Sequence, residues 1–222
     1  MDGSTDIDGY GGTGNDKIIG GLFTNTMDLY GDDGDDKIWA INPEQRGLET
    51  NSGGSDATLY GGLGNDVIYG SDVADDLYGD LDSAINSTAA FIGGDDVIFG
   101  YGGDDTLDGG AGNDFMDGGD GDDSMRGRVG DDKIFGRAGD DDIIGDTANA
   151  DGSQEFGDDK LYGGDGDDNI QGGYGDDLIF GDAGDDNLSG NAGEDIIYGG
   201  SGADFIDSGL GWDTIFGGDG CD

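Results

Sequence analysis

The chain has 222 residues, of which 53 are glycine, and its 53 acidic residues against 8 Lys and Arg give a formal net charge of −45. This charge excludes nucleic acid as a fitting partner, because the phosphates would be repelled. One Cys and no His exclude an internal disulfide and any Ser-His or Cys-His catalytic pair. No run of about 18 apolar residues is present, so no membrane span is expected.

A chain with so few apolar residues and so much like charge stays disordered unless its charge is neutralised. Divalent cations are the simplest counter-charge. The last residues, GGDGCD, stop within a repeating pattern. We therefore expect the chain to be part of a longer protein.

A nine-residue pattern recurs along nearly the whole chain, and two adjacent copies read GGDGDDNIQ and GGYGDDLIF at residues 163–180. Glycine occupies positions 1, 2 and 4, Asp occupies position 6, and an apolar residue occupies position 8. The eighth position holds, in chain order, Ile18, Leu29, Ile38, Leu59, Ile68, Leu77, Ile98, Leu107, Met116, Met125, Ile134, Ile143, Leu161, Ile170, Ile179, Leu188, Ile197, Ile206 and Ile215. A fixed short period of this kind is typical of a solenoid.

Positions 7 to 9 of each copy predict a short strand, because the many glycines disfavour a helix. Alternation along a strand sends position 8 into the core and positions 7 and 9 outward. Each repeat then buries a single aliphatic side chain, which stabilises less than the ordering of nine residues costs. The apolar core alone therefore does not hold the fold, and bound ions are needed.

The pattern GGxGxDxUx, in which U is a large apolar residue, resembles the RTX (repeats-in-toxin, haemolysin-type) calcium-binding nonapeptide repeat, and the resemblance covers nearly all of residues 11–222. It implies an all-β, right-handed parallel β-roll, or β-solenoid, with two short strands per 18-residue turn and several Ca²⁺ ions between successive turns. We expect one array over residues 1–222, with loop insertions around 20–28, 40–56, 79–92 and 145–156. Whether residues 145–153 hide a degenerate repeat is left open.

The sixth-position aspartates are the candidate calcium ligands. Calcium takes six to eight oxygen ligands, glycine lets backbone carbonyls approach an ion, and Asp supplies charge on a short stem. These residues are Asp16, Asp36, Asp66, Asp75, Asp96, Asp105, Asp114, Asp123, Asp132, Asp141, Asp159, Asp168, Asp177, Asp186, Asp195, Asp204, Asp213 and Asp222. Met27 and Ala57 take this position in two repeats, where a full site is not expected. The fifth position, often Asp or Asn, supports the loop or faces water.

Alternate strands are expected to lie in opposite sheets. We call sheet A the sheet whose strands contain Ile18, Ile38, Ile68, Ile98, Met116, Ile134, Leu161, Ile179, Ile197 and Ile215, and sheet B the other. The outward side chains of sheet A include all four lysines and an aromatic stripe, predicted as an interaction face: Trp39, Tyr69, Phe99, Phe135, Tyr162, Phe180, Tyr198 and Phe216. Such a patch marks contact with a neighbouring domain or a second copy; alternatively, outward aromatics are simply favoured on strands.

Two classes of function remain. The resemblance implies a calcium-binding module of a secreted bacterial protein, exported by a type I system, folding on Ca²⁺ outside the cell, and accompanied in the parent protein by a catalytic or toxin domain. The alternative is a structural or adhesive extracellular protein of a surface layer, matrix or filament that self-associates through sheet A. No catalytic role is expected for these residues themselves.

Overall fold

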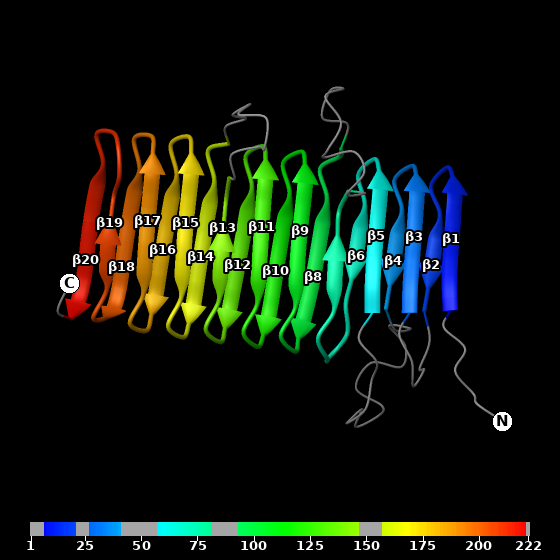
Figure 1. Cartoon of the computed structure of the whole chain (residues 1–222), viewed down its shortest axis with the longest axis horizontal. Coiled ribbons are helices and arrows are strands. Elements are labelled where there is room, and N and C mark those ends of the chain that lie inside the picture. The colour runs from blue at the N-terminus through cyan, green and yellow to red at the C-terminus, as the bar shows by residue number, and fades with distance from the viewer. Residues whose placement is uncertain (1–6, 21–26, 41–56, 81–92, 147–156, 221–222) are drawn as a thin grey trace.

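The protein is a parallel β-roll of two sheets. The computed structural model describes residues 7–20, 27–40, 57–80, 93–146 and 157–220. It has two ten-stranded sheets in which every pairing between strands is parallel, and the chain winds between them from β1 at one end to β20 at the other (Figure 1). The predicted fold class is confirmed. The described residues contain no helix long and apolar enough to cross a membrane.

The strands alternate between the two sheets in chain order. Sheet A contains β2 (Lys17–Ile19), β4 (Lys37–Trp39), β6 (Val67–Tyr69), β8 (Val97–Gly102), β10 (Phe115–Asp120), β12 (Lys133–Ala138), β14 (Lys160–Asp165), β16 (Leu178–Ala183), β18 (Ile196–Gly202) and β20 (Thr214–Gly220). Sheet B contains β1 (Ile7–Thr13), β3 (Met27–Asp33), β5 (Ala57–Leu63), β7 (Asp76–Tyr78), β9 (Thr106–Ala111), β11 (Ser124–Val129), β13 (Asp142–Ile144), β15 (Asn169–Tyr174), β17 (Asn187–Ala192) and β19 (Phe205–Asp207).

The assignment of strands to sheets agrees with the sequence prediction throughout. In particular, β12 pairs with β14 and β13 pairs with β15, so the chain between Ile144 and Gly157 does not exchange the two sheets. The inserted stretches 21–26, 41–56, 81–92 and 147–156 lie outside the described residues. Each turn stacks in register on the next, with position 8 over position 8, as Ile134, Leu161 and Ile179 illustrate.

One strand was missed by sequence analysis. Strand β1 pairs with β3 and places Gly9 opposite Leu29, at the position where every later strand has an apolar side chain. A Cβ on Gly9 would lie 2.9 Å from Leu29 Cδ2, so the leucine side chain already occupies this space. A pattern that requires an apolar residue at position 8 does not identify a strand that has glycine at that position.

The core is a single file of aliphatic side chains between the sheets. Sixteen of the 19 predicted core residues are buried, Ile18 and Ile206 are partly buried, and Met27 and Ala57 join the cluster. Ile215 is 47% exposed. It lies on β20, which has a neighbouring strand, β18, on one side only. Alternation along each strand therefore sets burial, and stacking completes it.

The outward faces carry ladders of aromatic rings. On sheet A the predicted stripe runs from Trp39 to Phe216 with neighbouring ring centroids 4.6 to 5.8 Å apart, and Phe115 fills the place where β10 has Asp117. Sheet B carries a shorter ladder of stacked tyrosines, Tyr10, Tyr30, Tyr60 and Tyr78, 4.8 to 4.9 Å apart. These separations match the spacing of neighbouring strands, about 4.8 Å.

Candidate metal centre

The sixth-position aspartates form two columns, one along each edge of the roll. Each residue stands directly before a strand, at the end of a glycine-rich loop, so the turns stack the carboxylates above one another. Column A, before the strands of sheet A, contains Asp16, Asp36, Asp66, Asp96, Asp114, Asp132, Asp159, Asp177, Asp195 and Asp213. Column B contains Asp75, Asp105, Asp123, Asp141, Asp168, Asp186 and Asp204, and Asp222 lies outside the described residues.

From Asp36 onward, one oxygen of each carboxylate accepts a hydrogen bond from the backbone of the neighbouring turn. The backbone N–H of Asp114 donates to Oδ1 of Asp132 at 2.8 Å, and the backbone N–H of Asp123 donates to Oδ1 of Asp141 at the same distance. The same bond recurs along both columns, down to Asp195 N–H on Asp213 Oδ1 at 3.2 Å. This ladder sets the orientation of each carboxylate and directs its other oxygen, Oδ2, into the loop.

Most of these second oxygens are buried without a hydrogen-bond partner. Fifteen predicted ligands share this property: Asp16, Asp36, Asp66, Asp96, Asp105, Asp114, Asp123, Asp132, Asp141, Asp159, Asp168, Asp177, Asp186, Asp195 and Asp204. An ionised carboxylate buried without a partner is very unfavourable. The folded chain therefore needs either bound cations or protonation of these carboxyl groups.

A backbone carbonyl from the next turn lies beside most of these oxygens. A Cβ built on Gly136, at position 1, would be 2.1 Å from Asp141 Oδ2 and 2.7 Å from the carbonyl oxygen of Gly163. At Gly181 the corresponding distances to Asp186 Oδ2 and Gly199 O are 2.2 and 2.5 Å. The bare Cα of the first glycine therefore faces a carboxylate oxygen of its own repeat and a carbonyl oxygen of the next turn.

This donor set fits a hard divalent cation. Within the described residues, no three Asp, Glu or Cys side chains come close enough together to hold a metal ion by themselves. A carboxylate oxygen of one loop beside a carbonyl oxygen of the next turn is the kind of mixed oxygen set that calcium accepts. Glycine at position 4 also allows close stacking of the loops: Gly121 has φ +137°, and a Cβ there would lie 2.1 Å from the carbonyl oxygen of Gly103.

Burial raises the pKa of many of the sixth-position aspartates well above the usual value. Desolvation, followed by the repulsion of neighbouring carboxylates, raises the pKa of Asp132 to about 10. Desolvation is also the largest cause at Asp96 and Asp177, where the pKa rises to about 9, and at Asp141, where it rises to about 7. Without cations the loops therefore favour protonated carboxyl groups.

The fifth-position residues both support the loop and face water. The backbone N–H of Asp140 donates to Oδ1 of Asp122 at 2.9 Å, and that of Asp167 donates to Oδ1 of Asp140 at 2.8 Å, while these side chains stay exposed. This second ladder runs in the direction opposite to the sixth-position ladder. Each loop is therefore bound to both of its neighbours.

Three turns near the start of column B differ from the pattern. Met27 and Ala57 bring apolar side chains to the sixth position, and both are buried in the core. The structure gives Asp75 another environment, because its Oδ2 accepts hydrogen bonds from Ser71 N–H at 2.6 Å and from Ser71 Oγ–H at 2.9 Å. The carboxylate of Asp75 is thus compensated inside the protein.

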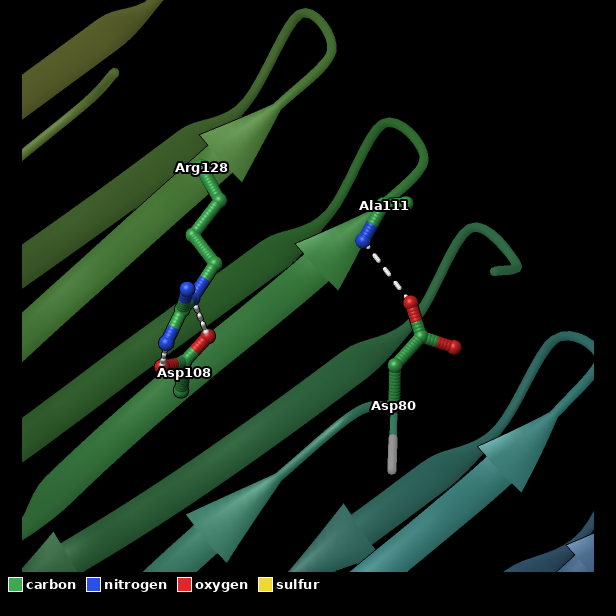
Figure 2. A network of polar contacts seen from close by, with 4 residues as sticks. All are labelled: Asp80, Asp108, Ala111 and Arg128. Carbon is green, nitrogen blue, oxygen red and sulfur yellow. Dashed lines mark hydrogen bonds and ion pairs between the residues drawn. The ribbon is translucent and has the colours of Figure 1, made fainter. Parts of the chain in front are cut away.

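Two functional candidates were missed by sequence analysis, Asp80 and Asp146. Each is buried and carries an unpartnered oxygen, Oδ1. Both occupy position 2, which the nine-residue pattern reserves for an outward or absent side chain. Position 2 also supplies Arg128, which pairs with Asp108 on the face of sheet B (Figure 2). The signal available in the sequence is that an aspartate precedes each of the stretches 81–92 and 147–156.

The comparisons with known proteins agree with this geometry. A family profile described as RTX calcium-binding nonapeptide repeat (4 copies) matches residues 10–27, 52–83, 93–116, 117–149, 155–188 and 189–222. A comparison with curated proteins found no match.

We predict that Gly118→Ala lowers the calcium response strongly, because the new Cβ would lie 2.1 Å from Asp123 Oδ2. Gly102→Ala is the matched control, since its Cβ meets nothing closer than 3.5 Å. Circular dichroism during a calcium titration checks this. Equal midpoints for the two variants would contradict the proposed position of the loop oxygens.

We also predict an inverted pH dependence in the absence of calcium. The pKa of an unfolded Asp is about 3.9, whereas burial raises it to about 7 in Asp141 and about 10 in Asp132. The folded state therefore binds more protons, so its stability is greatest below the unfolded pKa and is lost as the pH rises through the folded values.

Acidification from pH 8 to pH 5 in EDTA should accordingly raise the melting temperature or restore β structure. In saturating calcium the trend should reverse, because protons compete for the ligands. Melting curves followed by circular dichroism at both conditions test this. A calcium-free chain that loses structure on mild acidification would refute the role of the buried carboxyls.

Proposed function

We propose that this chain, which belongs to the RTX calcium-binding nonapeptide repeat family, is a module of a secreted bacterial protein that folds when it binds calcium outside the cell. Repeats of this family bind Ca²⁺ and are typical of secreted bacterial proteins. The chain itself is a calcium-binding β-roll. We propose further that the chain folds after export and that the sixth-position aspartates bind the ions.

The observation that carries the proposal is the row of fifteen buried, unpartnered Oδ2 atoms, each supplied by a sixth-position Asp. We assign these carboxylates as ligands, together with the carbonyl oxygen of the first glycine in the following turn. When bound, calcium supplies the positive charge that these oxygens lack. Because the unfolded chain does not bring the two turns together, binding free energy becomes folding free energy.

This linkage suits export and folding in different compartments. At low calcium the net charge of −45 keeps the chain extended. Each proposed site takes its ligands from two neighbouring turns. At the millimolar calcium outside a cell, a turn that has folded around one ion therefore already presents part of the ligand set for the next ion. We infer an extracellular or cell-surface location and no catalytic role for the array, while a catalytic domain elsewhere in the parent protein is compatible with it.

The second candidate is a structural or adhesive protein that associates through sheet A. The ladder of rings from Trp39 to Phe216 favours it, because the stripe runs along nearly the whole length of the roll. Lys17 and Lys133 lie over rings of the same face, 5.2 Å from the Trp39 centroid and 4.8 Å from the Phe135 centroid. The stacking argues against association through sheet A, because the rings already cover part of one another's surface.

Variants of the adjacent residues Asp140 and Asp141 distinguish the effect of ligand charge from the effect of hydrogen bonds that support the loop. Asp141→Asn keeps the acceptor for Asp123 N–H but removes charge from a buried, unpartnered oxygen. Asp140→Asn keeps the acceptor for Asp167 N–H and removes charge from an exposed side chain. We expect Asp141→Asn to reduce the rise of melting temperature with calcium, and Asp140→Asn to leave that rise nearly unchanged.

The measurement is circular dichroism from EDTA to about 10 mM Ca²⁺, a range that spans the affinities of extracellular sites, with Mg²⁺ as a further control. The parent chain should change cooperatively from disorder to β structure. A chain that shows no calcium response, or variants with identical responses, would disprove the assignment of column B.

Association through sheet A is tested by Phe180→Ser with Tyr198→Ser, and by Gln171→Ser on sheet B as the control. If sheet A is a contact surface, sedimentation in saturating calcium should show assemblies of the parent chain and of the control that are lost in the double variant. Equal sedimentation of all three, with unchanged circular dichroism, would eliminate self-association through this face.

A further inference from the structure

Two turns of the roll contain an additional buried carboxylate at position 2. In most uninterrupted turns this position has a positive φ, as in Gly119 (φ +120°) and Asp182 (φ +73°), and the Asp182 side chain is exposed. Asp80 and Asp146 are not among the residues with positive φ, and their side chains turn inward, where they are 4% and 5% exposed. The same residue type thus lies outside the loop in one turn and inside it in two others.

The two inward aspartates make equivalent contacts. The Asp80 carboxylate accepts the N–H of Ala111 at 2.7 Å and also that of Gly94. The Asp146 carboxylate accepts the N–H of Gly157 at 2.9 Å and also that of Tyr174. Ala111 and Tyr174 both stand at position 3 of the following turn, and Gly94 and Gly157 both stand at position 4 of the loop that continues into sheet A.

In both residues Oδ2 accepts a backbone hydrogen bond, from Ala111 N–H in Asp80 and from Gly157 N–H in Asp146. Oδ1 of Asp80 and Oδ1 of Asp146 are buried without a partner. In Figure 2 a dashed line joins one oxygen of Asp80 to the Ala111 amide. If closing the loop were the only task, the hydrogen bonds would suffice, and burial of the second oxygen would bring only a cost.

Both aspartates directly follow a glycine whose Cα faces a column A carboxylate: a Cβ on Gly79 would lie 2.1 Å from Asp96 Oδ2, and a Cβ on Gly145 would lie 2.1 Å from Asp159 Oδ2. Desolvation is the largest cause of the raised pKa in Asp66, Asp96 and Asp114, which belong to three successive turns, and the negative charge of Asp80 adds to it. Desolvation is likewise the largest cause of the raised pKa in Asp132, Asp159 and Asp177, and there the charge of Asp146 adds to it. Asp96 and Asp159, the column A members of the interrupted loops, also have an unpartnered Oδ2.

We propose that Asp80 and Asp146 each add a second carboxylate to a column A cation site, so that these two turns bind Ca²⁺ more tightly than the uninterrupted turns. This inference rests on the proposed function, since it assumes that column A binds calcium. The affinity of oxygen-ligand calcium sites rises with the number of charged ligands. An extra carboxylate therefore makes two sites of higher affinity in an otherwise regular series.

The test uses the full chain, Ca²⁺ alone as the probe, and four variants: Asp80→Asn, Asp146→Asn, the double variant, and Asp182→Asn as the control at the same position. Asn keeps an acceptor for the backbone N–H groups while removing the charge. Equilibrium dialysis with radioactive calcium counts tight and weak sites. The parent chain and Asp182→Asn should show two tight sites, each single variant one, and the double variant none, with about tenfold weaker binding at the altered sites.

A second measurement distinguishes a ligand from a purely structural carboxylate. If the aspartates bind calcium, the difference in melting temperature between the parent and Asp146→Asn grows as calcium increases. If they only close the loop, the difference is independent of calcium, and the number of tight sites does not change. Either of these results overturns the proposal, as does failure of the variants to reach the parental circular dichroism spectrum at saturating calcium.

Failure of the role proposed for Asp80 and Asp146 can be distinguished from failure of the proposed function. A parent chain that binds no calcium, or an Asp141→Asn variant with an unaltered calcium response, would contradict calcium binding by the sixth-position aspartates. Normal behaviour of those proteins combined with two intact tight sites in the double variant would contradict only the role of Asp80 and Asp146.

Discussion

The fold depends on a carboxylate oxygen that is buried in most of the loops and has no hydrogen-bond partner within the protein. Asp132 illustrates the arrangement: Oδ1 accepts a backbone N–H from the neighbouring turn, and Oδ2 is enclosed without a donor. The glycine at position 1 follows from it, since any Cβ there would collide with this oxygen. A core one side chain wide cannot offset such repeated desolvation. The stability of the roll is therefore governed by whatever neutralises these oxygens.

The sequence predicts most of this architecture because the information repeats every nine residues. Position 8 identifies the core, position 6 identifies the two columns, and simple alternation assigns strands to sheets. The misses share a physical origin. Strand β1 has Gly9 where the pattern requires an apolar side chain, and the inward turn of Asp80 and Asp146 depends on φ at position 2. Spacing does not encode that angle, so the same residue at Asp182 faces solvent.

The aromatic ladders show how an outward face can be cohesive without a partner. Rings on successive turns stand at the strand spacing, so Tyr162, Phe180 and Tyr198 stack nearly parallel, with interplanar angles of 2° and 3°. Stacked aromatic pairs contribute about 0.5–1.5 kcal/mol beyond the area they bury. The sequence predicted the stripe but not this mutual packing. Nor could it show that Phe115 would continue the ladder past Asp117, because that contact joins an outward position 7 to an outward position 9.

The two columns differ in the first turns, so the two ends of the roll are not equivalent. As far as β7, column B has apolar Met27 and Ala57, and Asp75 is compensated by Ser71, so only column A leaves oxygens unpartnered in those turns. From Asp105 onward both columns do. The first turns therefore have fewer charges to neutralise and can form a seed. In a stack where each turn contacts only its neighbours, the more highly charged turns would then add to this template one at a time.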